Sequence, residues 1–283
     1  MTTIAILAAG AMGSALAARL TVNGADVLTL LDGRSPATRD RAVAAGMTDT
    51  DLPGLMRAAL LLSIVPPADA EALAVSLAPV LAAATQKPVY VDCNAVNVET
   101  VRRIAGIVAA TGAAFLDGAI IGLPPKPGTP GPRLHVSGDA VESARPLRDL
   151  GVDLRLNSGG IGAASGLKMA YAGINKGLTA LAALMVLGAE RAGAGEALRA
   201  ELSETEPALL ARFARGLPDM LPKAQRWVAE MHEIADFLGD DAAGRQVFAG
   251  AAGLYARLSG ADEAGDGACL TAFAAACGSS QPS

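Results

Sequence analysis

A lysine, a tyrosine and an asparagine share one face of a long apolar stretch in the second half of the chain. In SGLKMAYAGINKG, Lys168, Tyr171 and Asn175 are spaced i, i+3 and i+7, which places their side chains on one side of a helix. A lysine held away from water has a lowered pKa and can exchange a proton near neutral pH. We therefore expect a catalytic group in which Lys168 donates or accepts the proton. The alternative is a lysine in a structural ion pair, or one whose ammonium extends into solvent.

A glycine-containing turn near the start of the chain predicts a nucleotide site. The run IAILAAGAMGSALAARL divides into a short buried strand (residues 3–7), the turn AAGAMG and a helix (residues 14–22). In the fingerprint G-x-G-x-x-G the glycines allow a tight turn, close approach of the pyrophosphate and packing of helix on strand. Here the first glycine is replaced, which weakens the match. The turn residues expected to bind the cofactor are Ala8, Gly10, Ala11, Met12 and Gly13.

The same run has one feature of a secretion signal, because Ala15-Leu16-Ala17 has the small residues of a cleavage site. A signal sequence, however, carries positive charge before its apolar core, and no lysine or arginine precedes this run. The run is also shorter than the roughly 20 apolar residues that cross a bilayer. We expect neither export nor membrane insertion.

An acidic residue follows the second predicted strand, about 20 residues after the turn, where such a residue meets the adenosine ribose. In DGRSPATR, Asp32 favours the free 2′-hydroxyl of NAD. Arg34, Ser35 and Arg39 could instead hold the 2′-phosphate of NADP. These residues leave both cofactors possible.

Three further segments place functional residue types at strand ends. The turn SIVPP, with Val65 and Pro66, is expected to pack against the cofactor. The strand end VDCNAV supplies Asn94, which could bind the cofactor or could cap the helix that begins at VETVRRIA. The long glycine- and proline-rich excursion from Phe115 to Gly131 has the character of a functional loop.

Composition excludes several functional classes. The chain has 283 residues, is 52% hydrophobic and 18% charged, and carries a net charge of −5, which predicts a folded chain with no basic surface for nucleic acid. Its three cysteines have no C-x-x-C spacing and its two histidines lie apart, so we expect neither a disulfide framework nor a metal site. A reducing cytoplasm suits this cysteine content.

The pattern of the chain changes near residue 160. Up to that point short apolar runs alternate with helical ones, which predicts a doubly wound, parallel α/β sheet. Beyond it the pattern is helical throughout, so we expect two domains, residues 1–160 and 161–283. A helix near residues 162–192 is apolar almost all round, which predicts burial inside a domain or against a second subunit. The expected strands are residues 3–7, 26–31, 59–65, 89–92, 114–117, 134–137 and 152–156.

Taken together, AAGAMG, DGRSPATRDRA, LSIVPP, VDCNAV, LDGAIIGLPP, SGLKMAYAGINKG and AQRWVAEMHEIAD resemble the β-hydroxyacid dehydrogenase and 6-phosphogluconate dehydrogenase superfamily. The likeness is to its NAD-binding branch with a C-terminal domain of unknown function, and imine reductases are similar in build. It implies a Rossmann domain joined by a long helix to an all-α domain, and a homodimer built around that helix. It also implies that Lys168 moves a proton while hydride passes to or from a nicotinamide.

The resemblance also implies a substrate site and a cofactor preference. LDGAIIG is similar to the superfamily's substrate loop. The stretch AQRWVAEMHEIAD either closes the pocket or is an ordinary amphipathic surface helix, and its pattern alone favours the surface helix. Where the superfamily has Ser-Gly-Gly for a carboxylate, this chain has Ile-Gly-Leu, so a ketone, aldehyde or imine becomes an alternative to a small hydroxyacid. GRS resembles the Asn-Arg-Thr element for NADP, so NADP(H) is favoured and NAD(H) is possible. A non-catalytic NADP sensor is a third interpretation. The expected substrate residues are Asp117, Gly118, Ile121, Gly122 and Trp227.

Overall fold

The computed structural model describes residues 2–125, 131–260 and 265–278. The chain forms two compact units, residues 1–168 and residues 169–283, which we call unit 1 and unit 2. The division falls within one helix, α7 (Ala163–Arg191), and not ahead of it, because the first turns of α7 make their contacts in unit 1.

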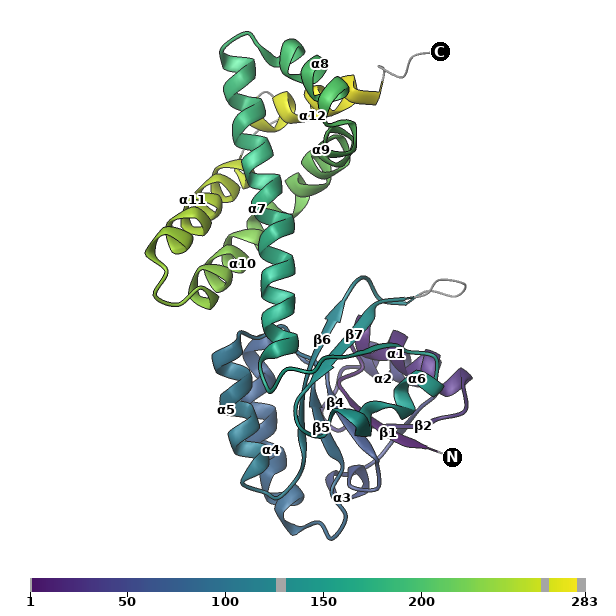
Figure 1. Ribbon diagram of the computed structural model, residues 1–283. Helices are drawn as coiled ribbons and strands as arrows, with labels where there is room; N and C mark the ends of the chain where they lie inside the picture. Colours follow the sequence, from purple (N-terminus) through teal and green to yellow (C-terminus); the bar gives the residue numbers. More distant parts are fainter. Residues whose placement is uncertain (1, 126–130, 261–264, 279–283) are drawn as a thin grey trace. The chain divides into compact units, whose positions relative to one another are not determined.

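Unit 1 contains an eight-stranded sheet with the order β3-β2-β1-β4-β5-β6-β7-β8 (Figure 1). The first six strands are mutually parallel, which confirms the doubly wound α/β prediction. The strands are β1 (Thr3–Leu7), β2 (Asp26–Thr29), β3 (Met47–Asp49), β4 (Leu60–Ser63), β5 (Val89–Asp92), β6 (Phe115–Ile121), β7 (Arg133–Ser137) and β8 (Asp153–Leu156).

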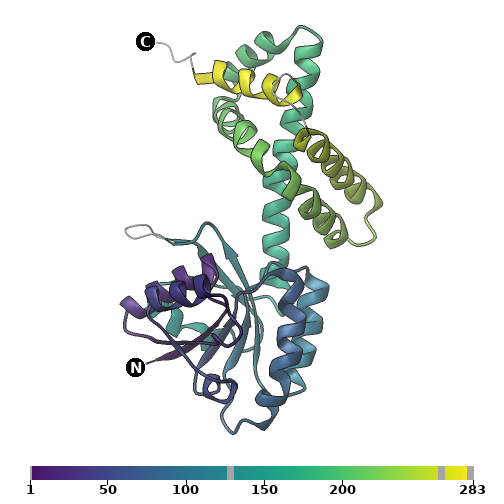
Figure 2. The same ribbon diagram turned by 180° about the vertical axis from the view of Figure 1, so that it is seen from behind.

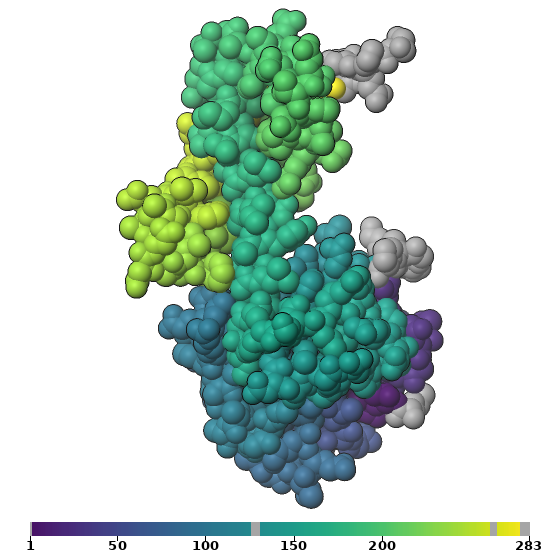
Figure 3. Space-filling model, viewed as in Figure 1, coloured from purple at the N-terminus to yellow at the C-terminus, as the bar shows by residue number. Residues whose placement is uncertain are grey.

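Helices cover both faces of this sheet (Figures 1 and 2). The apolar run of β1 shows why, since Ile4 and Ile6 belong to one core and Ala5 and Leu7 to the other. A strand buried on both sides therefore reads as continuously apolar. Side chains fill the space between these ribbons on the face seen in Figure 3. The helices of unit 1 are α1 (Ala11–Val22), α2 (Pro36–Ala44), α3 (Leu52–Leu55), α4 (Ala70–Ala83), α5 (Val98–Ala109) and α6 (Pro146–Asp149), with 3₁₀ turns at Pro67–Asp69 and Val141–Ala144.

The sheet differs from the all-parallel prediction at β7, which runs antiparallel to β6. Parallel neighbours need a crossover of a dozen or more residues, usually helical, whereas antiparallel neighbours can be joined by a short connection. The segment between Ile121 and Arg133 contains no helix among its described residues. Strand β3 was not predicted, because it has three residues and only its first is buried.

Strand β6 continues to Ile121, so the predicted loop beginning at Phe115 is wrong in its first half. Gly118 lies within this strand. In the structure a Cβ at that position would lie 2.9 Å from the carbonyl oxygen of Asp92 and 3.0 Å from the Cys93 sulfur. The glycine therefore permits close packing of β6 on the end of β5, and it does not interrupt the strand.

Unit 2 is helical throughout its described part, as predicted. Two glycines of α7 admit a neighbouring helix, since Cβ atoms at Gly173 and Gly177 would lie 3.2 and 3.3 Å from the Phe248 ring of α11. The remaining helices are α8 (Gly195–Thr205), α9 (Pro207–Met220), α10 (Ala224–Phe237), α11 (Ala242–Ser259) and α12 (Asp266–Gly278), with a 3₁₀ turn at Leu221–Lys223.

Helix α7 is apolar but is not buried all round within this chain, so of the two expected forms of burial only that against a second subunit stays open for its exposed face. Its side chains Ile174, Leu181 and Met185 are 67%, 55% and 58% exposed. Among the described residues, α7 alone has the length and apolar composition of a membrane-spanning helix. In unit 2 it also makes polar bonds to its neighbours, with Lys176 paired to Glu230 of α10 and Asn175 accepting from Arg212 of α9.

Candidate functional site

The turn between β1 and α1 presents free backbone donors. Gly10 is the N-cap of α1 and provides no side-chain cap, so the first N–H groups of the helix have no partner within it. These amides and the positive end of the helix dipole suit an anion such as a pyrophosphate. The turn that the sequence predicted is therefore built in a form that can bind a dinucleotide.

Glycine is required at the third position of the fingerprint but not at the first. A Cβ on Gly13 would overlap the carbonyl oxygen of Ala8, so the helix can approach the strand only without a side chain there. Among the described residues only glycines have a positive φ, so the φ of Ala8 is negative. The φ angle at residue 8 therefore does not itself require glycine.

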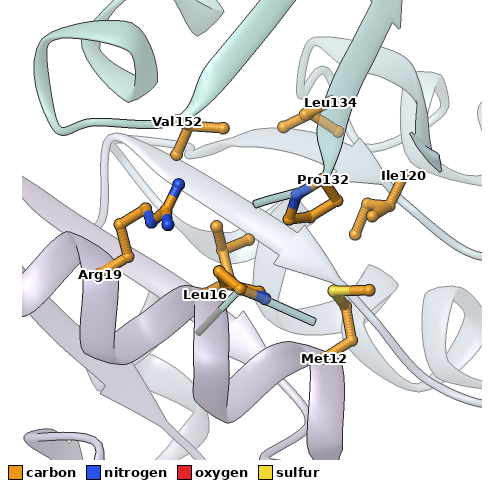
Figure 4. A pocket seen from close by; sticks show the side chains of 8 residues that line it. Met12, Leu16, Arg19, Ile120, Pro132, Leu134 and Val152 are labelled. Carbon is orange, nitrogen blue, oxygen red and sulfur yellow. The ribbon is translucent and has the colours of Figure 1, made fainter. Parts of the chain in front are cut away.

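Met12 extends into the interior and away from the turn (Figure 4). Its side chain helps to line a small cavity of about 10 Å³ between α1 and the β6–β7 pair, room for about one water. The other residues that line this cavity are Leu16, Arg19, Ile120, Pro125, Pro132, Leu134 and Val152.

An open pocket lies beyond the end of β2, where the adenosine was expected. Asp32 and Arg34 line it, together with Asp49 and Thr50 from the end of β3. Within the described residues the side chains of Asp32 and Arg34 make no hydrogen bond or ion pair, so both are available to a ligand. Ser35 is the N-cap of α2, and its hydroxyl accepts from the Thr38 N–H at 3.3 Å.

Asn94 lies buried at the end of β5 and holds two strand ends together. Its Oδ1 accepts from the Val65 N–H at 2.7 Å, and its Nδ2 donates to Ser63 Oγ at 2.8 Å and to Asp92 Oδ2 at 3.1 Å. Through these bonds Asn94 positions the turn at Val65, and its predicted contact with the cofactor stays a prediction. It is not the cap of α5, since Asn97 has that role.

A buried carboxylate that was not predicted as a site residue, Asp92, neighbours Lys168. Burial raises the pKa of Asp92 to about 6, and the adjacent Asp117 acts in the same direction. Hydrogen bonds from Asn94 and the positive charge of Lys168 oppose this rise. Burial raises the pKa of the Cys93 thiol, and the positive charge of Lys168 opposes part of this rise. The lysine therefore lies close to the carboxyl end of β5, within unit 1.

Raising the pH is expected to destabilise the wild-type protein relative to Asp92→Asn. The folded-state pKa is about 6 and an unfolded aspartate has a pKa near 3.9, so the folded state binds the extra proton between these values. The contribution of Asp92 to the free energy of unfolding is complete below about pH 4 and is lost as the pH rises through about 6. The difference is about 3 kcal/mol. Urea unfolding of both proteins from pH 4 to pH 7 measures this change, and a constant difference would contradict it.

Asp117 does not face a substrate. It is fully buried in β6, and its carboxylate accepts from Ser137 Oγ at 3.2 Å, from the Gly162 and Ser165 N–H groups at 3.0 Å each, and from Ser165 Oγ at 2.6 Å. It thereby binds β7 and the first turn of α7 to β6, with a negative charge at the positive end of α7. The predicted substrate contact is replaced by a role in fixing the helix that carries Lys168.

The other predicted loop residues end the β6–β7 pair. Ile121 is half-buried and pairs with Arg133. Gly122 has φ +129°, and a Cβ there would lie 3.0 Å from the Cα of Pro132, so this position requires glycine. Beyond it, residues 126–130 of the predicted loop lie outside the described residues.

In unit 2 the residues predicted near Lys168 have partners of their own. Tyr171 is 50% exposed. Asn175 donates to the Tyr171 carbonyl at 2.7 Å and accepts from Arg212 at 2.8 Å. Trp227 packs edge-on against Tyr255, with ring centres 5.3 Å apart, and Lys176 Nζ lies 5.5 Å from the centre of its ring. Lys168 belongs to unit 1 by its contacts, whereas these residues belong to unit 2.

A known family model matches a segment of each unit. Residues 3–141 match the model described as the NAD binding domain of 6-phosphogluconate dehydrogenase. Residues 189–258 match a model described as a domain of unknown function, DUF1932. No protein of curated function matches the chain.

Solved structures share the fold over nearly the whole chain. A conserved hypothetical protein from Sinorhizobium meliloti 1021 is 29% identical over 96% of this chain and 97% of its own, with a TM-score of 0.79. MTH1747, a protein of unknown function described as structurally similar to 3-hydroxyacid dehydrogenases, is 27% identical over 92% of this chain and 100% of its own, with a TM-score of 0.74. The 3-hydroxyisobutyrate dehydrogenase of Mycobacterium tuberculosis is 19% identical over 96% and 99%, with a TM-score of 0.69. An imine reductase from Myxococcus stipitatus, in complex with NADP+, is 20% identical over 96% and 99%, with a TM-score of 0.55.

Proposed function

We propose that this chain, whose N-terminal domain belongs to the family of the NAD binding domain of 6-phosphogluconate dehydrogenase, is an NAD(P)-dependent oxidoreductase. Its fold is related to those of hydroxyacid dehydrogenases and imine reductases. The observation that carries the proposal is the turn at Gly10 and Gly13, where an uncapped helix end and a required glycine provide the donors and the space for a pyrophosphate.

In this proposal Lys168 is the proton donor or acceptor. The bound nicotinamide supplies or accepts the hydride. Lys168 donates a proton to the substrate oxygen or nitrogen during reduction, and takes it back during oxidation. Its position beside the carboxyl ends of the strands, close to Asp92, supports this role, because ligands of doubly wound sheets bind at that edge.

The substrate we propose is a small carbonyl or hydroxyl compound. The apolar Ile121 and the strained Gly122 stand where a carboxylate-binding serine was expected from the resemblance. Without that serine, the loop is less suited to the carboxylate of a hydroxyacid. A ketone or an imine is therefore the alternative substrate class. We propose NADP(H) as the preferred cofactor, supported by the guanidinium of Arg34, which lines the pocket beyond β2 and makes no hydrogen bond or ion pair within the described part of the chain.

Titration calorimetry with NADPH and with NADH tests the proposal without a substrate. We expect saturable binding of NADPH at micromolar concentration, and binding of NADH at least about tenfold weaker, a gap of about 1.4 kcal/mol. A comparable affinity for both would leave an oxidoreductase with no cofactor preference. Absence of binding by either nucleotide at millimolar concentration would contradict the proposed function.

We also propose a homodimer in which α7 packs against a second copy of the chain. The exposed Ile174, Leu181 and Met185 are spaced along one face of the helix, so they form a continuous apolar stripe. Light scattering is expected to give the mass of a dimer for the wild type and of a monomer for Leu181→Glu combined with Met185→Glu. The control is Val247→Glu, which changes an exposed apolar residue of α11. A monomeric wild type would exclude the dimer.

A further inference from the structure

We infer that Arg41 is a specificity-determining residue for the cofactor, whose guanidinium binds the 2′-phosphate of NADP(H). The inference rests on the proposed function and names a residue outside the predicted site. Arg41 lies in the last turn of α2, and its Nε donates to the carbonyl oxygen of Ala9 at 3.2 Å. Ala9 is part of the turn that leads into α1. A guanidinium from another helix is thus bonded to the predicted nucleotide turn.

A line of side chains along α2 holds this guanidinium in place. Its Nη2 donates to Thr38 Oγ1 at 2.9 Å, and that hydroxyl lies 3.1 Å from Ser35 Oγ at the start of the helix. Ser35, Thr38 and Arg41 are spaced by three residues, so all three lie on one face. Two of the five N–H donors of Arg41 are used in these bonds. The other three make no hydrogen bond within the described residues, so they remain for a ligand.

The charges of the neighbourhood favour a phosphate at this place. Arg39 is oriented in a similar way, with Nε donating to the Arg34 carbonyl at 3.2 Å, so its terminal nitrogens are also unused. The carboxylates of Asp49 and Asp51 in the pocket already accept backbone N–H groups, from Leu31 and Gly54 respectively. Among the three carboxylates that line the pocket, that of Asp32 makes no hydrogen bond within the described residues, and Arg34 lines the same pocket.

A ribose with a free 2′-hydroxyl needs no cation beside it, since the carboxylate of Asp32 would suffice. A 2′-phosphate needs its charge neutralised, and arginine suits it through two parallel hydrogen bonds. The competing interpretation is that Arg41 only ties α2 to the turn. In that case its loss would weaken every nucleotide equally, because all of them share the pyrophosphate.

The test uses adenosine fragments and needs neither a nicotinamide nor a substrate. Calorimetry compares adenosine 2′,5′-bisphosphate with adenosine 5′-diphosphate, and NADPH with NADH, on the full chain. The variants are Arg41→Ala and Arg41→Lys. Arg57→Ala is a matched control, because Arg57 is exposed and its Nε also donates to a backbone carbonyl, that of Gly54 at 3.2 Å. A thermal melt of each variant establishes that it is folded.

We expect Arg41→Ala to weaken the 2′-phosphorylated ligands at least about tenfold and to change the affinity for adenosine 5′-diphosphate and NADH less than about twofold. Arg41→Lys should recover part of the loss, and Arg57→Ala should have no effect. Equal weakening of all four ligands, or no effect on any, would overturn the inference and leave the proposed function intact. If the wild type binds none of them, the proposed function fails and the inference fails with it.

Discussion

Replacement of Lys168 by alanine is expected to abolish turnover and to leave the affinity for NADPH within about threefold of the wild type. The ammonium lies near Asp92 at the carboxyl edge of the sheet, and the turn that would hold the pyrophosphate is formed by other residues. Removal of a general acid or base lowers a rate by roughly 10²–10⁴-fold. Cofactor binding depends on other residues, so binding and catalysis should separate in this variant.

The measurement is the initial rate of NADPH oxidation with a panel of ketones, aldehydes and imines, and of NADP reduction with hydroxyacids. Lys176→Ala is the matched control, because Lys176 is a second lysine of α7 that pairs with Glu230 within unit 2. It should keep most of the wild-type activity. If Lys168→Ala keeps its activity with the substrate that the wild type turns over, Lys168 is not the proton donor. If the wild type binds NADPH and turns over nothing in the panel, the sensor interpretation gains support.

Replacement of Asp117 by alanine is expected to destabilise unit 1 by about 3–5 kcal/mol, because several buried donors lose their acceptor at roughly 1–3 kcal/mol each. The change leaves the buried N–H groups of Gly162 and Ser165 without an acceptor. It also removes the negative charge from the start of α7. We expect Asp117→Asn to be intermediate, because its carboxamide can accept some of these bonds but places a donor against the others.

Urea unfolding, with hydrogen exchange of the β6 and β7 amides, reports the loss where it arises. Ser165→Ala is the control, since it removes one hydrogen bond of 2.6 Å to the same carboxylate and leaves the charge in place. Its cost should be about 1.5–3 kcal/mol, the range for a hydrogen bond to a charged group. A loss below about 1 kcal/mol for Asp117→Ala would mean that the network contributes little to the fold.

The local pattern of the sequence determined those features that depend on neighbours in the chain. The order of strand, turn and helix at residues 3–22 and the long helix beginning near residue 163 follow from apolar spacing and glycine placement. The acidic residue after β2 follows from its distance to the turn. Each of these is a property of a short segment, and a short segment carries its own backbone preferences.

The tertiary structure decided which side chains are used by partners distant in the sequence. Asp117 and Asn94 have residue types that suit a ligand, yet they are buried and hydrogen-bonded to segments distant in the sequence. Met12 is partly buried and lines the cavity beside β6 and β7. The bond from Arg41 to Ala9 spans 32 residues and leaves no mark in the local pattern. Hydrogen bonds and burial depend on which segments pack together in space, so they appear only when the sheet and its helices are assembled.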